Sequence, residues 1–295
     1  MDATPSHQLG RASAAFRKYL LPGFVFQSVV IAGGYGTGRE IVEFFMTQGP
    51  VGGLLGMLLV STVIWSAVSA VSFEFSRRYG AYEYRAFFRR LLGPGWVLFE
   101  ICYLAMLAVV LAVIAAAAGS MLQETFGLPY VTGVVGIMLA VGFLVFKGSA
   151  TIERALAGWS FVLYGVYIVM FAWAFSVFGD EIVGTLASGP TQSGWFVGGL
   201  QYAGYNLAVI PAVLFAVRHA NTRRQAVTAG VLAGPIAIIP GLLFYLAMLG
   251  QYPAILDRSV PANALLEVLG SRGFQILFQV VLFGTLIETG TGMIH

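Results

Sequence analysis

One apolar segment of the sequence is interrupted in a way that an ordinary membrane helix is not. Residues 19–46 are long and apolar enough to cross a bilayer, yet residues 29–45 read VVIAGGYGTGREIVEFF. Each glycine costs about 1 kcal/mol of helix stability relative to alanine, and ionised side chains inside a bilayer are unfavourable unless they face a cavity or a partner. Broken backbone at that depth is tolerated only where it is buried in protein or lines a water-filled cavity. We therefore predict two half-helices, at about 19–31 and 39–47, with a binding site between them.

A continuous helix is the alternative for this segment. Gly34 and Gly38 have the i, i+4 spacing of small residues at membrane helix contacts, but this packing does not account for the adjacent Arg39 and Glu40. If the helix is broken, its exposed peptide groups are candidates for substrate binding. These residues are Gly33, Gly34, Tyr35, Gly36, Thr37 and Gly38.

The composition is that of a polytopic membrane protein. Of 295 residues, 58% are hydrophobic and only 10% are charged, and the mean hydropathy is +0.84, far from the values of a soluble domain. We predict eight spans in contact with the lipid bilayer, at about 19–46, 51–76, 95–122, 130–147, 156–178, 196–217, 226–249 and 274–295.

The same sequence gives no sign of an enzyme. The single Cys102 excludes a disulfide framework, and the three histidines, at positions 7, 219 and 295, have no metal-ligand spacing. An HExxH motif is absent, and no GxSxG motif stands in a suitable context. We therefore expect no catalytic residues and no cofactor other than a coupling ion.

The basic residues fix the orientation rather than indicating a nucleic-acid partner. With the N-terminal tail 1–18 in the cytoplasm, 13 of the 16 Lys and Arg residues fall on the cytoplasmic side, as the positive-inside rule requires. They include an amphipathic stretch at 81–93, which we expect along the membrane surface. We expect the chain in the cytoplasmic (inner) membrane of a bacterium. The 13 are Arg11, Arg17, Lys18, Arg77, Arg78, Arg85, Arg89, Arg90, Lys147, Arg154, Arg218, Arg223 and Arg224.

Residues 195–217 repeat the interruption of the first span. Several polar residues and a glycine lie close together at mid-span, and Pro211 follows them. Proline is best tolerated in the first turn of a helix. We predict an outer half-helix to about 203, an unwound patch at 203–208, and an inner half-helix from about 209. A proline-kinked helix is the alternative. The clustered residues, which we expect to bind substrate, are Gln201, Tyr202, Gly204, Tyr205 and Asn206.

Two further segments are predicted from their patterns. Residues 260–270 begin with Val-Pro-Ala-Asn and continue as a periodic apolar run, which predicts a short helix over the outer face. Residues 156–178 are rich in aromatic side chains, Tyr167 among them, and most of this set is expected to face lipid or its interface.

The two interrupted spans stand five spans apart and therefore run in opposite directions, which is the pattern of inverted five-helix repeats. AGGYGTGREIVEFF, LQYAGYN and GTLIETGTG resemble the YkvI-type bacterial membrane proteins, which are similar to the amino acid–polyamine–organocation superfamily with its leucine-transporter fold. The resemblance implies an all-α fold with a first repeat at 19–178 and a second at 195–295. It also implies a ten-helix core, of which eight spans are present, so we expect the chain to be a fragment that lacks later helices.

The resemblance implies a secondary active transporter for a small organic solute, amino-acid-like or amine-bearing, that works by alternating access. Tyr103 resembles the tyrosine that contacts substrate in this fold. A coupling sodium ion would lie between carbonyls near Ala32 and Tyr35 and the hydroxyls of Thr285 and Thr289, since oxygen ligands suit a hard cation. Glu288 leaves protons as the alternative coupling ion. A membrane receptor or ligand sensor with the same fold, without transport, is the alternative function.

Three charged residues near the first break are candidates for ion coupling or gating. Arg39 lies near the positive end of the predicted outer half-helix, where a cation is disfavoured, which favours a carboxylate partner from the protein or from the substrate. Glu43 at i+4 and Glu288 are the two candidates in the protein, and Glu40 is placed to cap the helix start.

The orientation can be tested by labelling from outside. In a background without Cys102, Arg85→Cys should resist an impermeant thiol reagent in intact cells and react after permeabilisation, because residue 85 belongs to a cytoplasmic segment. Strong labelling of Arg85→Cys in intact cells would show that the predicted orientation is reversed.

Overall fold

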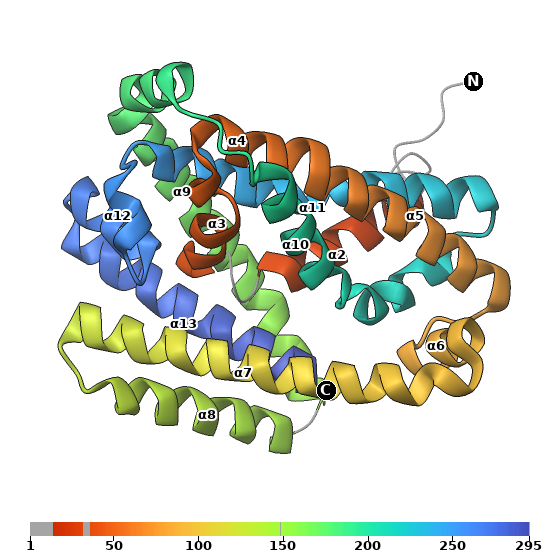
Figure 1. Ribbon diagram of the computed structural model, residues 1–295. Helices are drawn as coiled ribbons and strands as arrows, with labels where there is room; N and C mark the ends of the chain where they lie inside the picture. Colours follow the sequence, from red (N-terminus) through yellow and green to blue (C-terminus); the bar gives the residue numbers. More distant parts are fainter. Residues whose placement is uncertain (1–13, 32–35, 148, 295) are drawn as a thin grey trace, which may run out of the picture. The chain divides into compact units, whose positions relative to one another are not determined.

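The computed structural model describes residues 14–31, 36–147 and 149–294, and every regular element in these ranges is a helix (Figure 1). The predicted all-α class is therefore confirmed for the described residues. In chain order the helices are η1 (Phe16–Leu20), α2 (Leu21–Val30), α3 (Arg39–Phe44), η3 (Met46–Gln48), α4 (Pro50–Leu55), η4 (Gly56–Ser61), α5 (Thr62–Tyr79), α6 (Tyr84–Leu92), η5 (Gly93–Gly95), α7 (Trp96–Phe126), α8 (Tyr130–Lys147), α9 (Ser149–Ser188), α10 (Trp195–Leu207), η6 (Ile210–His219), α11 (Arg223–Leu249), η7 (Ala254–Asp257), α12 (Pro261–Leu269) and α13 (Arg272–Ile294).

Six helical segments in the described part of the chain are long and apolar enough to cross a membrane, or up to seven if one bent pair counts as a span. The six match the predicted spans 2, 3, 4, 5, 7 and 8, and the bent pair, α10 with η6, matches span 6. Span 1 is not among them, and residues 32–35 in its predicted range lie outside the described residues. The total of eight spans therefore remains a prediction.

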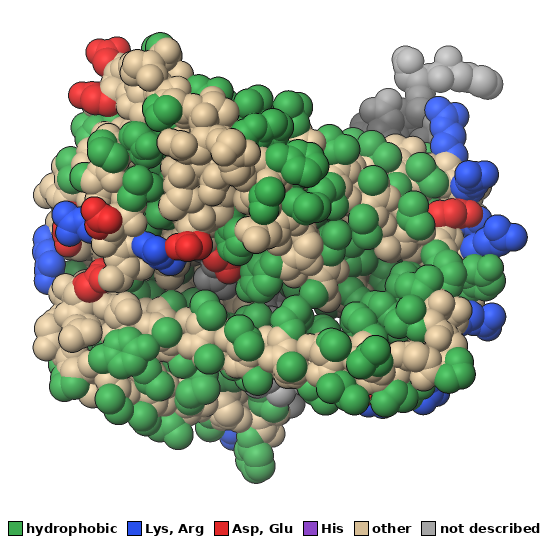
Figure 2. All heavy atoms as spheres, viewed as in Figure 1, with side chains coloured by type: hydrophobic (Ala, Val, Ile, Leu, Met, Phe, Trp, Pro, Cys, Tyr) green, Lys and Arg blue, Asp and Glu red, His purple; other side chains and the backbone are tan. Residues whose placement is uncertain are grey.

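Large apolar side chains cover the outside of these helices. Val71 of α5, Leu98 of α7 and Leu139 of α8 are 71%, 68% and 69% exposed, and hydrophobic side chains dominate the face seen in Figure 2. Such surfaces are unfavourable in water and favourable against lipid tails. They support contact of the helices with a bilayer.

The described helices fall into two compact units that interleave along the chain. The first comprises Met1–Val30, Leu55–Tyr103 and Phe196–Pro240, and the second Ile31–Leu54, Leu104–Trp195 and Gly241–His295. Each unit therefore takes helices from both predicted repeats. The unit boundary follows Val30, immediately before the predicted break in span 1.

The first unit is organised around Trp65 of α5. The ring of Trp65 is fully buried, with its centroid 5.3 Å from that of Phe26 in α2 and 5.6 Å from that of Tyr202 in α10. Its indole N–H donates to the carbonyl of Ala203 at 3.3 Å. One side chain thus joins three helices that are far apart in sequence.

The second unit packs α13 against α8 and α9, and α7 and α8 form an antiparallel pair (Figure 1). An aromatic cluster lies inside it, with the ring centroid of Tyr167 in α9 within 5.5 Å of Phe278 and 6.1 Å of Phe244. Small residues allow the helices to approach. A Cβ at Gly119 of α7 would lie 2.6 Å from the ring of Tyr130 in α8, as expected for membrane helix contacts.

Removing the Trp65 ring should destabilise the first unit. Trp65→Ala is expected to lower the free energy of unfolding by about 3–5 kcal/mol, the range for truncating a buried aromatic side chain, as measured by denaturant unfolding in detergent. Trp65→Phe, which keeps a ring but loses the hydrogen bond, should lose less than half of this. Val71→Ala on the exposed face of the same helix is the control; a similar loss there would contradict the role of Trp65.

Candidate functional site

Helix α3 begins at Arg39, the residue at which the second half-helix of span 1 is predicted to start, and the reason is local. Gly38 adopts a left-handed conformation with φ of 77°, which glycine accepts without steric strain. A Cβ at this position would also lie 3.0 Å from the sulfur of Met248 and 3.2 Å from Pro261. Gly38 is the N-cap residue, and the hydroxyl oxygen of Thr37 just before it accepts the Arg39 N–H at 3.3 Å. The α-helix ends at Phe44, short of the predicted residue 47.

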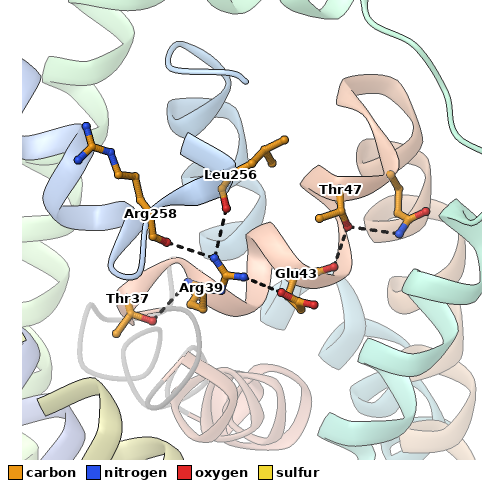
Figure 3. Close-up of polar contacts among 7 residues, drawn as sticks. Thr37, Arg39, Glu43, Thr47, Leu256 and Arg258 are labelled. Atoms are coloured by element: carbon orange, nitrogen blue, oxygen red, sulfur yellow. Dashed lines mark hydrogen bonds and ion pairs between the residues drawn. The ribbon is translucent and has the colours of Figure 1, made fainter. Parts of the chain in front are cut away.

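Arg39 connects this half-helix to the segment between α11 and α12 (Figure 3). Its Nη1 donates to the carbonyl oxygens of Leu256 and Arg258, each at 3.2 Å, and its Nη2 donates to Glu43 Oε2 at 2.8 Å. The i, i+4 pair with Glu43 is one of the two predicted pairings. The other, with Glu288, concerns a side chain outside the described part of the structure.

The two carbonyl contacts were not foreseen from the sequence, because nothing in the sequence brings residues 256 and 258 to Arg39. A helix of six residues has little stability of its own, so α3 depends on such contacts for its position. The Arg39 and Glu43 side chains are 45% and 60% exposed, and an exposed ion pair contributes little. The bonds to the backbone carbonyls therefore fix the arrangement more than the ion pair does. Glu40 lies in the first turn of α3.

Tyr167 belongs to the aromatic set at 156–178, most of which is predicted to face lipid, and the sequence does not single it out as a site residue. Its side chain is 8% exposed, and its hydroxyl has no hydrogen-bond partner among the described residues. A Cβ built at Gly36 would lie 3.6 Å from that hydroxyl oxygen. Leu282 packs against Gly36 as well. A buried hydroxyl without a partner loses the hydrogen bonds that it makes in water. Tyr167 is therefore a polar group held against the start of the outer half-helix.

No clear sequence signal could have identified Tyr167. Buried residues recur along α9 at 163, 166–167, 170–171, 174 and 178, which is the stripe of a helix with one face packed inward. Because both faces of this helix are apolar, the pattern of hydrophobicity does not show which face is buried.

Two hydroxyls proposed as cation ligands lie one turn apart on α13. Thr285 and Thr289 are 1% and 8% exposed, and they donate to the carbonyls of Val281 at 2.9 Å and of Thr285 at 3.0 Å. A hydroxyl that donates in this way keeps oxygen lone pairs for a cation. The other predicted ligands, Ala32 and Tyr35, lie outside the described residues, as do Gly33, Gly34 and the side chain of Glu288.

The segment predicted as span 6 is sharply bent, at a later point than predicted. Helices α10 and η6 meet at a bend of 65°, and the predicted patch at 203–208 is helical as far as Leu207. At the bend the backbone hydrogen bonds connect residues three positions apart instead of four. Ala208 N–H donates to Tyr205 O at 3.4 Å, and Val209 N–H donates to Asn206 O at 3.2 Å. Pro211 has no N–H to continue the α-helical ladder, so the break falls just before it and the chain continues as a 3₁₀-helix.

Because residues 201–206 are helical, their side chains point to different sides of α10. Tyr202 and Asn206, at i and i+4, are buried, and the Asn206 amide donates to the Tyr202 carbonyl at 3.1 Å. Gln201 and Gly204 are exposed and Tyr205 is half-buried. The structure thus divides the predicted patch between two faces.

Tyr103 lies near the amphipathic stretch that the sequence predicts, which forms α6. Its ring stacks at 5.9 Å on Tyr84 of α6 and at 6.0 Å on Phe99 of α7. These contacts hold Tyr103 in an aromatic cluster of the first unit. Its predicted contact with substrate remains a prediction.

Apolar helices of membrane-spanning length, one of them broken, define the chain as a polytopic α-helical membrane protein. The chain is similar to the "Uncharacterized membrane protein YkvI" of Bacillus subtilis (strain 168), with 23% identity over 279 residues that cover 92% of this chain and 78% of that protein. This similarity supports a YkvI-type membrane protein. No protein-family model and no solved structure matches the chain.

The contacts of Arg39 predict how residues 254–258 respond when the Arg39 side chain is removed. Arg39→Ala should raise amide hydrogen exchange at residues 254–258 roughly tenfold, because the carbonyls of Leu256 and Arg258 lose charge-assisted hydrogen bonds. Glu43→Gln is the matched control, since it removes the ion pair and leaves both carbonyl contacts in place. Equal exchange in the two variants, measured by mass spectrometry of the full chain in detergent, would contradict this role of Arg39.

Proposed function

We propose that the protein is a secondary active transporter for a small organic solute, amino-acid-like or amine-bearing, coupled to sodium or protons through alternating access. In this proposal it lies in the bacterial cytoplasmic membrane with its N-terminus inside. The helices form two inverted repeats of the leucine-transporter type, with the first helix of each repeat interrupted.

The observation that carries the proposal is the break in span 6, which the sequence predicts together with a break in span 1. The 65° bend between α10 and η6 leaves backbone groups without regular α-helical bonds in an apolar segment. Such groups are tolerated at membrane depth only where protein buries them or where they line a polar cavity. Interrupted helices in transporters supply these groups to solutes and ions. Each of the two units contains helices from both predicted repeats, which also favours intertwined repeats.

A hydrogen bond to the solute is the role we assign to Tyr167. Its hydroxyl is buried, has no partner among the described residues, and stands next to Gly36 at the start of the outer half-helix. An amino or carboxyl group of a solute can pair with a phenol as either donor or acceptor. The neighbouring Phe244 and Phe278 rings provide an apolar wall around it.

The coupling ion is assigned to α13. Thr285 and Thr289 present buried oxygen atoms on one face of the helix, and oxygen ligands suit sodium. Glu288 is the residue through which a proton would couple instead, because a carboxyl group in a membrane segment must be neutralised by a proton or a cation. The dependence of uptake on each gradient distinguishes these two ions.

Uptake into proteoliposomes tests the proposal. Mixed radiolabelled amino acids and amines should accumulate inside the vesicles when a sodium or a proton gradient is imposed. Without a gradient, the labelled solutes should only exchange with unlabelled solute across the membrane. Thr289→Val should raise the ion concentration for half-maximal uptake roughly tenfold, equivalent to about 1.4 kcal/mol, if sodium is the coupling ion. Binding without flux under any gradient would indicate a sensor.

Matched variants separate these roles from general damage. Thr291→Val removes a buried hydroxyl two residues away that donates to the Ile287 carbonyl at 2.7 Å, and should leave the ion dependence unchanged. Tyr167→Phe should raise KM roughly 5- to 30-fold, from the loss of about 1–2 kcal/mol, whereas Tyr130→Phe at an exposed site should not. If Thr289→Val and Thr291→Val changed the ion dependence of uptake equally, the assignment of the coupling ion to α13 would be wrong.

A further inference from the structure

The amphipathic helix α6 is anchored by its aromatic residues and presents its arginines outward. Phe87 is 5% exposed, with its ring centroid 5.0 Å from Phe75 of α5, and Phe88 stacks on Phe99 of α7. At the other end of the helix, Leu91 and Leu92 are 49% and 44% exposed. The helix is therefore held in one orientation, with apolar and basic side chains on its free surface.

The arginines around α6 fall into two groups. Arg77 and Arg85 are neutralised by carboxylates, at 2.7 Å from Glu74 and 3.2 Å from Glu100. Three others have no ion pair among the described residues, and each lies over an aromatic ring instead. Arg89 is 4.4 Å from the ring centroid of Trp96, and both Arg78 and Arg90 lie over Tyr79, at 5.9 Å and 5.7 Å.

The convergence of Arg78 and Arg90 on one ring is the informative observation. The two side chains come from different helices, α5 and α6, and each is within 6 Å of the same centroid. Their like charges repel each other, and salt screens this repulsion only in part at short range. An anion bound by both guanidinium groups converts this repulsion into attraction. Guanidinium groups bind phosphate oxygens through paired hydrogen bonds.

The surroundings favour a lipid phosphate over a soluble one. Leu91 and Leu92 are exposed beside the arginines, and Trp96 begins the apolar span α7 directly after the turn at Gly93–Gly95. Basic amphipathic helices with flanking aromatic residues lie at the boundary between headgroups and acyl chains. Figure 2 shows Lys and Arg side chains at the end of the first unit where α5 leads to α6.

We propose that Arg78, Arg89 and Arg90, supported by Tyr79 and Trp96, form a binding site for the headgroup of an anionic phospholipid. The rings hold the guanidinium groups in place, so the site differs from a flexible polybasic segment. Leu91 and Leu92 contact the acyl chains of the same leaflet. This site is independent of the proposed transport activity.

Native mass spectrometry of the full chain in detergent can test the site by titration with phosphatidylglycerol and phosphatidylcholine. The unaltered protein should retain phosphatidylglycerol in preference to phosphatidylcholine. The triple variant Arg78→Gln/Arg89→Gln/Arg90→Gln should weaken phosphatidylglycerol binding at least tenfold and leave phosphatidylcholine binding unchanged. Thermal unfolding of the variant in phosphatidylcholine-containing micelles checks that it remains folded.

The matched control removes the same charge elsewhere in the first unit. Arg218→Gln/Arg223→Gln/Arg224→Gln changes three exposed arginines that have no ion pair among the described residues, and it should keep the phosphatidylglycerol preference. Equal loss in both triple variants would show that net charge rather than a site is responsible. Displacement of phosphatidylglycerol by inorganic phosphate at equal concentration would overturn the assignment to a lipid.

Discussion

The need to pair every backbone N–H and C=O group in an apolar medium determines most of this structure. A bilayer offers no water to replace a missing hydrogen bond, so a chain that enters it must form helices. This requirement explains why every described regular element is helical. It also makes a break in an apolar segment informative, because at Ala208 and Val209 the regular α-helical bonds give way to i−3 bonds.

The same requirement explains which parts of the fold could be predicted. Apolar runs of about 20 residues identify spans with little help from tertiary contacts, and residues 130–147 were predicted to the residue as α8. The helix at Pro261–Leu269 was also predicted, from a proline followed by a periodic apolar run. Span 6 shows the limit. Its polar cluster suggested unwinding at 203–208, but the backbone follows the missing N–H of Pro211 rather than the polarity of the side chains, and it breaks at 208–209.

The candidate site was predicted less completely, because its contacts depend on tertiary packing. The start of α3 followed from Gly38 and Arg39, and the Arg39–Glu43 pair from their i, i+4 spacing. The hydrogen bonds from Arg39 to Leu256 and Arg258 join residues more than 200 positions apart, and no local sequence pattern predicts them. The sequence does not single out Tyr167, because the hydrophobic pattern of a helix that is apolar on all sides does not show which face is buried. Its unpaired hydroxyl is visible only when the neighbouring helices are in place.

These contacts together constrain the short stretch from Gly36 to Arg39 from two sides. Tyr167 and Leu282 pack on Gly36, while Arg39 is tied to the carbonyls of residues 256 and 258. Gly38 lies between them in its left-handed turn, surrounded by Met248, Pro261 and Phe244. A helix as short as α3 has little stability of its own, so we expect a shift of the 254–261 segment to move the backbone beside Tyr167. Tyr167 and the 254–261 segment therefore contact the same short stretch of backbone within one unit, and a solute bound at Tyr167, as we propose, would act on the four residues that adjoin that segment.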